Sequence, residues 1–530
     1  MIETCEALTT GDLTALVAAL SRVEGRVSDA ERVDQLSVLE RVKSAAAAAQ
    51  VRVTAAFVTS QEQVAAGWHA RARECSDGSD FEGWRAARDQ AEAASLALPD
   101  DPQPGQPQTE PGQSGKGRRA EGSGSGRRRG RGSARGGLSG VVGQVALARR
   151  ESPTLGAGHV RLALALTGEM PYTYAALAAG VLSEWRAGLI VRETGVLTGE
   201  QRSAVDVEIA GPEGLGVELG MLGDRELVRR VKAVAYRIDP KSVLARNAHA
   251  HAQRRVSIRP APETMAYLTA LLPVAQAVAA YAALTQAADT ARAAGDPRSK
   301  GQVMADTLTT RVTGQSTADG VPVEVQVVIT DRALLAGEET PAQIPGYGTV
   351  PAAFARALIT PTTDPETDAV SGECGGARVW LRRLYTHPES GALVAMDSTR
   401  RLFDAGLRRF LLTRDGGTCR TPWCDAPIRH LDHVVDHAAG GPTNAGNGQG
   451  LCIRCNHTKQ HPGWTARTLT EADIGDRIDG DGWRHTVETT TPTGHTYRST
   501  APPLIPGLEP DPDDVTQRVL ARRLRAMLAA

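Results

Sequence analysis

The chain has 530 residues, of which 41% are hydrophobic and 4% aromatic, and its formal net charge is −1. A chain of this length is too long to fold around one ordinary hydrophobic core, so we expect roughly two to four domains. No stretch of about 18 uncharged apolar residues occurs, which argues against a membrane-spanning protein. The near-zero charge argues neither for nor against nucleic acid, so the local distribution of charge matters more.

The N-terminal residues and the use of cysteine indicate the cellular compartment of the protein. The first residues, MIETCEALTTGDLTALV, contain no basic region followed by an apolar core, so we expect no secretory signal peptide. Four of the seven cysteines fall within one short segment, a pattern that fits a reducing environment better than a disulfide framework. We therefore expect a cytoplasmic protein with no membrane partner.

Few aromatic residues and many alanines favour a mainly α, multidomain fold. Residues 1–98 are expected to form an N-terminal helical region, because Leu16, Leu20 and Val23 recur at helical spacing. Ser28, three residues before Glu31, resembles a capping box at the start of a second helix. Nothing in this region indicates chemistry. Its helices would pack on one another or on a second copy, so a homodimer through the helical region is one open interpretation.

Residues 99–140 are predicted to be a disordered linker that is basic and rich in Gly, Arg and Pro. Such a tract buries too little apolar surface to fold by itself. Eight Lys and Arg residues lie between Lys116 and Arg135, with Glu121 as the only acidic residue among them. The tract is either a solvated linker or an arm that follows phosphates without sequence preference.

Residues 141–359 are expected to form a helical domain with a short β element. The sequence MPYTYAALAAGVLSEWRAGLI indicates a helix, a break at Gly180 and a second helix. Alternation over residues 255–259 and 321–329 predicts two strands.

The rest of the chain divides into three predicted segments. Residues 360–376 form an acidic linker, 377–475 a compact domain, and 476–530 a C-terminal hairpin and helix. The compact domain is expected to begin with a hairpin over residues 379–397 and a helix over 398–415. Residues 400–469 contain ten Lys and Arg against five Asp and Glu, so this segment is locally basic.

Two cysteine pairs dominate residues 419–461. Cys419 and Cys424 form the first pair, and Cys452 and Cys455 the second. Such pairs suit four thiolates around one tetrahedral zinc ion. Because a tetrathiolate zinc site has no open position, we expect this ion to hold the fold and not to catalyse.

The helical region resembles a known family. The segments MPYTYAALAAGVLSEWRAGLI, RIDPKSVLARNAHAHAQRRVSIRPAPETMAYLTALLP, RSKGQVMADTL and IPGYGTVPAAFARALI are similar to the actinobacterial 13E12-repeat family. The helical part of that family is catalogued as a domain of unknown function, and it commonly precedes a C-terminal HNH nuclease domain. The resemblance therefore implies a zinc-clasped ββα-metal (HNH) domain near the C-terminus, and it leaves the role of the helical part open.

The cysteine-containing segment is similar to HNH nucleases at particular positions. The resemblance implies that His433 is the general base and that Asp432 is a carboxylate ligand of a divalent ion. It also implies that Asn447 holds the loop after the first strand and that Asn456 is the second metal ligand. Lys459 corresponds to the lysine of the motif, which contacts a phosphate.

The chemistry of these residue types agrees with that assignment. A neutral imidazole near pH 7 accepts a proton from water. Asp432 and Asn456 offer oxygen ligands, which favour Mg²⁺ or Mn²⁺ over a second zinc ion. Arg454 and His457 are further candidates for contact with nucleic acid. The roles of His430, His437 and His461 stay open among support of another residue, metal contact, phosphate contact and plain surface.

Three classes of function fit the sequence. A metal-dependent endonuclease that hydrolyses DNA phosphodiester bonds accounts for the whole set of motif residues. A non-cleaving, zinc-stabilised DNA-binding protein needs the cysteines and the basic segments alone. A zinc-stabilised scaffold or RNA-binding protein is the third, since DNA rather than RNA follows from the resemblance only.

Overall fold

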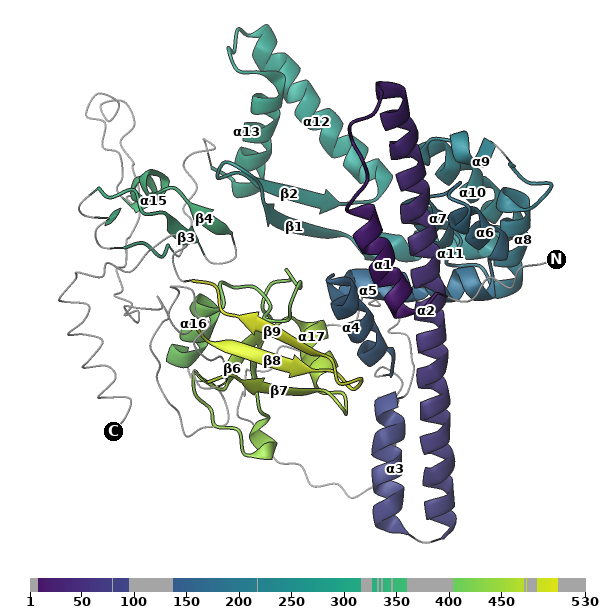
Figure 1. The fold of residues 1–530 in the computed structure, drawn as a ribbon. Coiled ribbons are helices and arrows are strands. Elements are labelled where there is room, and N and C mark those ends of the chain that lie inside the picture. The colour runs from purple at the N-terminus through teal and green to yellow at the C-terminus, as the bar shows by residue number, and fades with distance from the viewer. Residues whose placement is uncertain are drawn as a thin grey trace, which may run out of the picture. The chain divides into compact units, whose positions relative to one another are not determined.

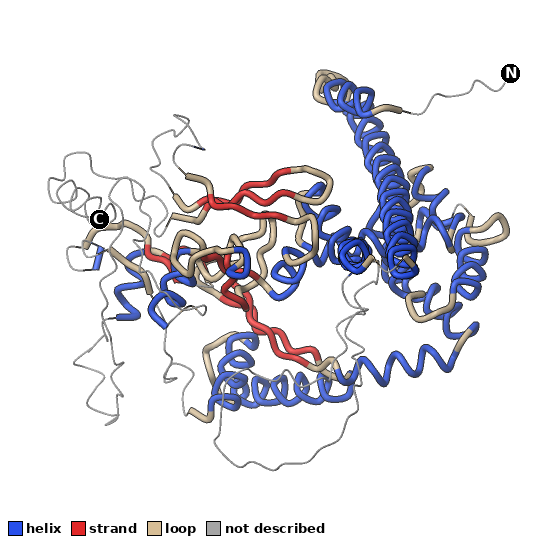
Figure 2. The backbone as a smooth tube through the Cα atoms, turned by 90° about the horizontal axis from the view of Figure 1, so that it is seen from below, coloured by secondary structure: helices blue, strands red, loops and turns tan. Residues whose placement is uncertain are grey.

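The structure is a computed structural model of the chain. It describes residues 8–78, 80–94, 137–216, 218–315, 327–330, 333–334, 337–344, 347–359, 403, 405–470, 473 and 484–503. Helices dominate the described part, and the strands there form three two-stranded sheets and one three-stranded sheet. Figure 2 shows the strands as red segments of the backbone tube and the helices in blue. The predicted mainly helical fold is confirmed at this level.

The chain divides into two compact units. One contains Met1–Phe57 and His159–Arg246, and the other contains Val58–Gly158 and Asn247–Ala530. Three helices continue across a boundary between the units along the chain: α2 (Asp29–Asp77), α5 (Pro153–Gly168) and α11 (Pro240–Ala252).

The first unit is built from helices around one apolar core. Besides its parts of α2, α5 and α11, it contains α1 (Thr10–Leu20), α6 (Pro171–Ala178), α7 (Glu184–Glu193), α8 (Gly199–Ala210), α9 (Glu218–Met221) and α10 (Asp224–Ile238). Leu166, Met170 and Ile190 are fully buried in this core. The predicted helix, break and helix are α6, Gly180 with φ +77° and α7. Glycine suits that break because the left-handed region carries no steric cost for it.

Polar groups fix the ends of helices in this unit. The buried carboxylate of Asp206 accepts hydrogen bonds from the backbone N–H groups of Tyr172 (2.7 Å) and Thr173 (2.8 Å), so it caps α6. At the start of α2, the backbone N–H of Glu31 donates to the Ser28 hydroxyl at 3.3 Å, which is one half of the predicted capping box.

The second unit holds the remaining elements. The helices are α3 (Phe81–Ala94), α4 (Gly137–Arg149), α12 (Val274–Ala293), α13 (Lys300–Thr313), α15 (Ala352–Ile359), α16 (Ala405–Arg414), the 3-10 turn η3 (His437–Ala439) and α17 (Ile453–Lys459). The strands are β1 (Arg255–Pro260), β2 (Ala266–Leu271), β3 (Ala342–Ile344), β4 (Gly348–Val350), β5 (His430–His433), β6 (Gly448–Leu451), β7 (Thr465–Thr468), β8 (Thr486–Thr490) and β9 (Thr496–Thr500).

The strand predictions have mixed outcomes. The strand predicted over residues 255–259 is β1, which pairs antiparallel with β2. Of the strand predicted over 321–329, residues 321–326 lie outside the described residues. Val328 forms only an isolated bridge with Gln343, through two backbone hydrogen bonds of 2.8 Å.

Other predicted segments fall partly or wholly outside the described residues. Those wholly outside are the acidic linker over 360–376, the hairpin over 379–397 and the C-terminal helix. The linker predicted over 99–140 is described only from residue 137, and there the prediction is wrong. The helix α4 begins at Gly137, because Val141, Val142 and Val145 bury their side chains and carry the preceding residues into the helix.

The C-terminal hairpin is confirmed. β8 and β9 are joined by a turn with Gly494 at φ +83°, and β8 also pairs with β7, which makes a three-stranded antiparallel sheet. Figure 1 shows this sheet in the same part of the second unit as α16, β6 and α17. The helix predicted over 398–415 is α16 in its described part. None of the described helices combines the length and the apolar character that crossing a membrane requires.

Candidate functional site

Four cysteines converge in the second unit. Cys419, Cys424, Cys452 and Cys455 are buried, and their sulfur atoms all lie within 4.8 Å of one another. None of them forms a disulfide. The two pairs, far apart in sequence, thus make one cluster that could hold a metal ion such as zinc, as their spacing predicted.

Local structure places these thiols. The first pair sits in a tight turn in which the Cys419 N–H donates to the Ala426 carbonyl at 2.9 Å. Cys452 is the N-cap of α17, and its sulfur accepts a hydrogen bond from the Cys455 N–H at 3.4 Å. Hydrogen bonds among the four thiols lower the pKa of Cys452 and raise the pKa of Cys424 and of Cys455. The backbone N–H bond favours the thiolate of Cys452, the form that ligates metals.

The strand β5 and the helix α17 face each other through two pairs of side chains. Residues two apart on a strand share a face, so His430 and Asp432 point to the same side of β5. Residues three apart on a helix also share a face, so Asn456 and Lys459 lie together on α17. The Asn456 Nδ2 donates to His430 Nδ1 at 2.7 Å, and the Lys459 ammonium pairs with Asp432 Oδ2 at 2.9 Å.

This arrangement puts the two predicted ligands of a divalent ion on facing elements. Asp432 lies on β5 and is paired with Lys459 of α17, and Asn456 lies on α17 and is paired with His430 of β5. Asn456 Oδ1 is buried and has no hydrogen-bond partner among the described residues. A buried polar atom normally has a partner. A partnerless amide oxygen and a carboxylate are both oxygen donors of the kind that a hard cation prefers.

His433 is the last residue of β5. Its Nε2 lies 2.8 Å from the Thr443 hydroxyl, and its ring centroid is 4.6 Å from that of the buried Phe403. Burial lowers the pKa of His433 below its ordinary value, although the nearby Asp432 acts in the opposite direction. The imidazole is therefore held neutral near pH 7, the state in which a ring nitrogen accepts a proton.

Asn447 is fully engaged with the loop after β5. Its Oδ1 accepts from the Val435 N–H at 2.8 Å, and its Nδ2 donates to the carbonyls of Val435 (2.9 Å) and Pro442 (2.8 Å). Gly441 is required in this loop, since a Cβ there would lie 1.9 Å from the Val435 carbonyl oxygen. The residue predicted to hold the loop does so through hydrogen bonds to the backbone.

The three candidates for contact with nucleic acid differ in their surroundings. The Lys459 ammonium donates to the His433 carbonyl and to Asp436, in addition to its pair with Asp432. Arg454 donates from Nη1 to the Pro153 carbonyl at 2.9 Å. His457 is exposed. Two of the three therefore contact protein groups in this structure.

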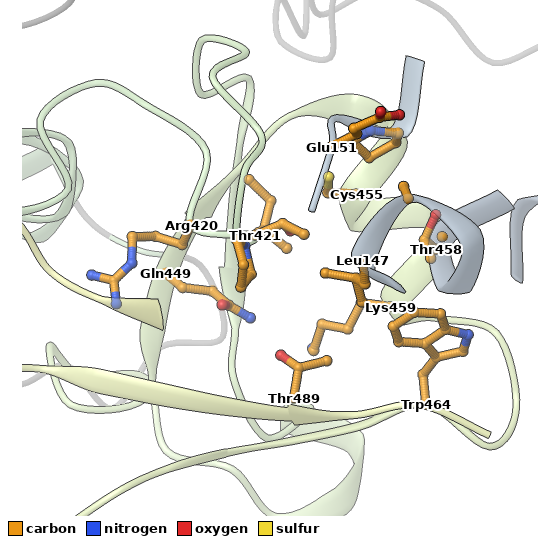
Figure 3. A pocket seen from close by; sticks show the side chains of 15 residues that line it. Leu147, Glu151, Arg420, Thr421, Gln449, Cys455, Thr458, Lys459, Trp464 and Thr489 are labelled. Atoms are coloured by element: carbon orange, nitrogen blue, oxygen red, sulfur yellow. The ribbon is translucent and has the colours of Figure 1, made fainter. Parts of the chain in front are cut away.

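The helix α4 packs against the cysteine-containing segment. Its Gly143 lies so close to Thr458 and Trp464 that a Cβ would be 2.7 Å and 3.1 Å from their side-chain atoms. Its Gln144 Oε1 accepts from the Thr493 hydroxyl at 2.7 Å. A pocket lies along this contact, and Figure 3 shows Leu147 from α4 together with Lys459 and Trp464 among its lining side chains.

A buried ionic cluster joins these elements. Asp415 lies between Arg414 and Arg420 at 2.8 Å and 3.2 Å, and it also accepts from the Gly450 N–H at 2.8 Å. Burial would raise the pKa of Asp415, but the two arginines outweigh it and hold the pKa below its usual value. Arg420 also donates to the His485 carbonyl, so the cluster ties β6 to the β8–β9 hairpin.

Sequence reasoning missed several of these residues. Thr443, Phe403 and Asp436 contact predicted site residues, yet no motif position marked them. The only sequence signal for the ionic cluster is the adjacent Arg414 and Asp415 pair shortly before Cys419. Nothing in the sequence around α4 indicated that this helix would pack against the cysteine-containing segment.

Comparison with known proteins identifies one part of the chain. Residues 123–366 match the family model of a domain of unknown function, DUF222. The match includes the helical segments that carry the resemblance described above, and it ends before the first cysteine of the cluster. No curated protein matches the chain, and no solved structure matches it.

Proposed function

We propose that the chain is a metal-dependent HNH endonuclease that hydrolyses DNA phosphodiester bonds, preceded by a helical region of the 13E12-repeat type. One observation carries the proposal: the facing of β5 and α17. Its support is that the Asp432 carboxylate and the buried, partnerless oxygen of Asn456 lie on these two facing elements. At the end of the same strand stands the neutral imidazole of His433.

The four thiolates and the two oxygen donors fit two metal ions with different roles, one structural and one catalytic. Zinc on the four cysteines would hold the fold, because four thiolates leave no open position for chemistry. When bound to Asp432 and Asn456, Mg²⁺ or Mn²⁺ would stabilise negative charge on the leaving 3′ oxygen. Oxygen ligands distinguish this second site from the thiolate cluster.

In the proposed reaction His433 is the general base. Its Nε2 is engaged by Thr443, which leaves Nδ1 to take a proton from the attacking water. The Phe403 ring packs against the imidazole at a tilt of 31° and helps to keep it in place. The products would carry 5′-phosphate and 3′-hydroxyl ends.

The test is nicking of supercoiled plasmid DNA with Mg²⁺ or Mn²⁺ by the full chain and by His433→Ala. Loss of a general base costs about 100- to 10,000-fold in rate. The control is His251→Ala, the same change at an exposed histidine of α11. Full activity in His433→Ala would overturn the assignment of the base. A parallel assay on RNA of the same sequence tests the choice of substrate.

Binding of the plasmid without nicking by the wild-type chain would instead indicate a non-cleaving, zinc-stabilised DNA-binding protein. The measured mass of the chain in solution decides whether the helical region forms a homodimer, which the sequence left open.

A further inference from the structure

Among the described residues, His430 is the one hydrogen-bond partner of the Asn456 side chain. The amide Nδ2 donates to the imidazole Nδ1 at 2.7 Å. Because an amide NH₂ group only donates, Nδ1 has to present its lone pair and the proton of the ring sits on Nε2. His430 lies two residues before Asp432 on the same face of β5.

The two ends of an amide are chemically different. The oxygen has lone pairs that ligate a hard cation, whereas the NH₂ group has none to give. With Nδ2 turned toward His430, Oδ1 is turned away from it and is the buried atom that lacks a hydrogen-bond partner in the described part of the chain. Rotation of the amide by half a turn would present N–H donors to the cation.

We propose that His430 is a positioning residue that selects the orientation of the Asn456 amide and thereby creates its oxygen ligand for a divalent cation. The inference rests on the proposed cation site formed by Asp432 and Asn456. It assigns a specific role to a histidine that the motif leaves unassigned, and it explains why this chain pairs an asparagine at position 456 with a hydrogen-bond acceptor at position 430.

The proposal makes a prediction that depends on chemical symmetry. A carboxylate at position 456 offers an oxygen in either orientation, so no neighbouring residue has to fix its orientation. The contribution of His430 to metal affinity should therefore exist with asparagine at position 456 and disappear with aspartate. A residue that merely supported the fold would contribute equally in both cases.

The experiment measures Mn²⁺ affinity of the zinc-loaded full chain by isothermal titration calorimetry. His430→Ala should weaken Mn²⁺ binding by about 10- to 100-fold, as loss of a group that orients a metal ligand usually does. His430→Gln, whose Oε1 accepts a hydrogen bond, should restore part of that loss. His251→Ala, the same change at an exposed histidine of α11, is the matched control and should leave affinity unchanged.

The decisive comparison adds Asn456→Asp. In that background His430→Ala should change Mn²⁺ affinity by less than about threefold. An equal loss in both backgrounds, or no loss in the asparagine background, would overturn the proposal. Zinc content and the thermal midpoint of each variant show whether it folds.

Metal binding separates this proposal from the proposed activity. A chain that shows the expected Mn²⁺ pattern but leaves plasmid DNA intact would overturn the nuclease and keep the role of His430. A chain that nicks DNA and binds Mn²⁺ equally well without His430 would overturn the role of His430 alone. Failure of the wild-type chain to bind Mn²⁺ would overturn both.

Discussion

Thr443 and His433 are joined by a hydrogen bond of 2.8 Å between the threonine hydroxyl and the imidazole Nε2. Thr443 is buried and follows the Gly440–Gly441 turn, so the loop after β5 carries it back to the imidazole at the end of that strand. Because Asn447 fixes the same loop, the position of Thr443 is set by the backbone. The bond holds the ring with Nδ1 available for a proton.

Thr443→Val should slow DNA cleavage while the chain stays folded. Valine keeps the shape of threonine but removes the hydroxyl, which frees the His433 ring to turn. A hydrogen bond of this kind contributes about 0.5–1.5 kcal/mol, so we expect a rate loss of up to about tenfold. Single-turnover nicking of plasmid DNA measures it. Thr443→Ser keeps the hydroxyl and should be nearly as fast as wild type; a rate for valine equal to that for serine would contradict the role of the bond.

The difference between Thr443 and His433 shows what sequence reasoning finds at this site. The cysteine pairs, Asp432 with His433, and Asn447 were marked by spacing or by motif, because each works within a short stretch of chain. Thr443 and Phe403 were not marked, since their contacts with His433 depend on how a loop closes and where a preceding segment packs. Contacts of that kind produce no periodic pattern or motif in the sequence.

The fold shows the same limit. Helix–break–helix around Gly180 and the hairpin around Gly494 were predicted because turn residues act locally. The helix α4 was partly taken for linker, because its glycines and the polar tract before it suggested disorder. Its order comes from burial of Val142 and Val145 against other parts of the second unit, and such burial is a tertiary effect.

Acid should loosen the β8–β9 hairpin through His485. Burial first, and then Arg414 and Arg420, lower the pKa of His485 from 6.5 to about 3. The unfolded chain takes up a proton below pH 6.5 and the folded chain does not, so this stabilisation is complete above pH 6.5 and declines as the pH falls toward 3. Between pH 7 and pH 5 the loss should be about 2 kcal/mol. Amide exchange of residues 486–500, corrected for intrinsic rates, measures it.

His485→Gln provides the comparison for this pH dependence. Glutamine does not titrate, and its NH₂ group can donate to the Gly446 carbonyl as His485 Nε2 does at 2.9 Å. The variant should therefore lose less protection between pH 7 and pH 5 than the wild type, whatever its stability at pH 7. The same decline in both proteins would exclude His485 as the source.

Removal of one cysteine of the cluster should release its metal and unfold its surroundings. Cys455→Ser leaves three thiolates and should reduce bound zinc well below the roughly one ion per chain expected of the wild type. Because binding of a structural metal is coupled to folding, proteolysis within residues 419–461 should become faster. Metal analysis and limited proteolysis measure the two effects. Cys75→Ser, at a free cysteine of α2, should change neither; undiminished zinc in Cys455→Ser would contradict the site.

Two glycines in neighbouring helices should respond in opposite ways to the same substitution. A Cβ at Gly143 of α4 would lie 2.7 Å from a Thr458 side-chain carbon, whereas a Cβ at Gly158 of α5 would have no atom within 4 Å. Alanine stabilises a helix by up to about 1 kcal/mol relative to glycine, and overpacking costs about 1–3 kcal/mol. Gly158→Ala should therefore raise the thermal midpoint and Gly143→Ala should lower it. Stabilisation by both would mean that α4 does not pack on α17, and the close approach of this helix to the cysteine-containing segment would be wrong.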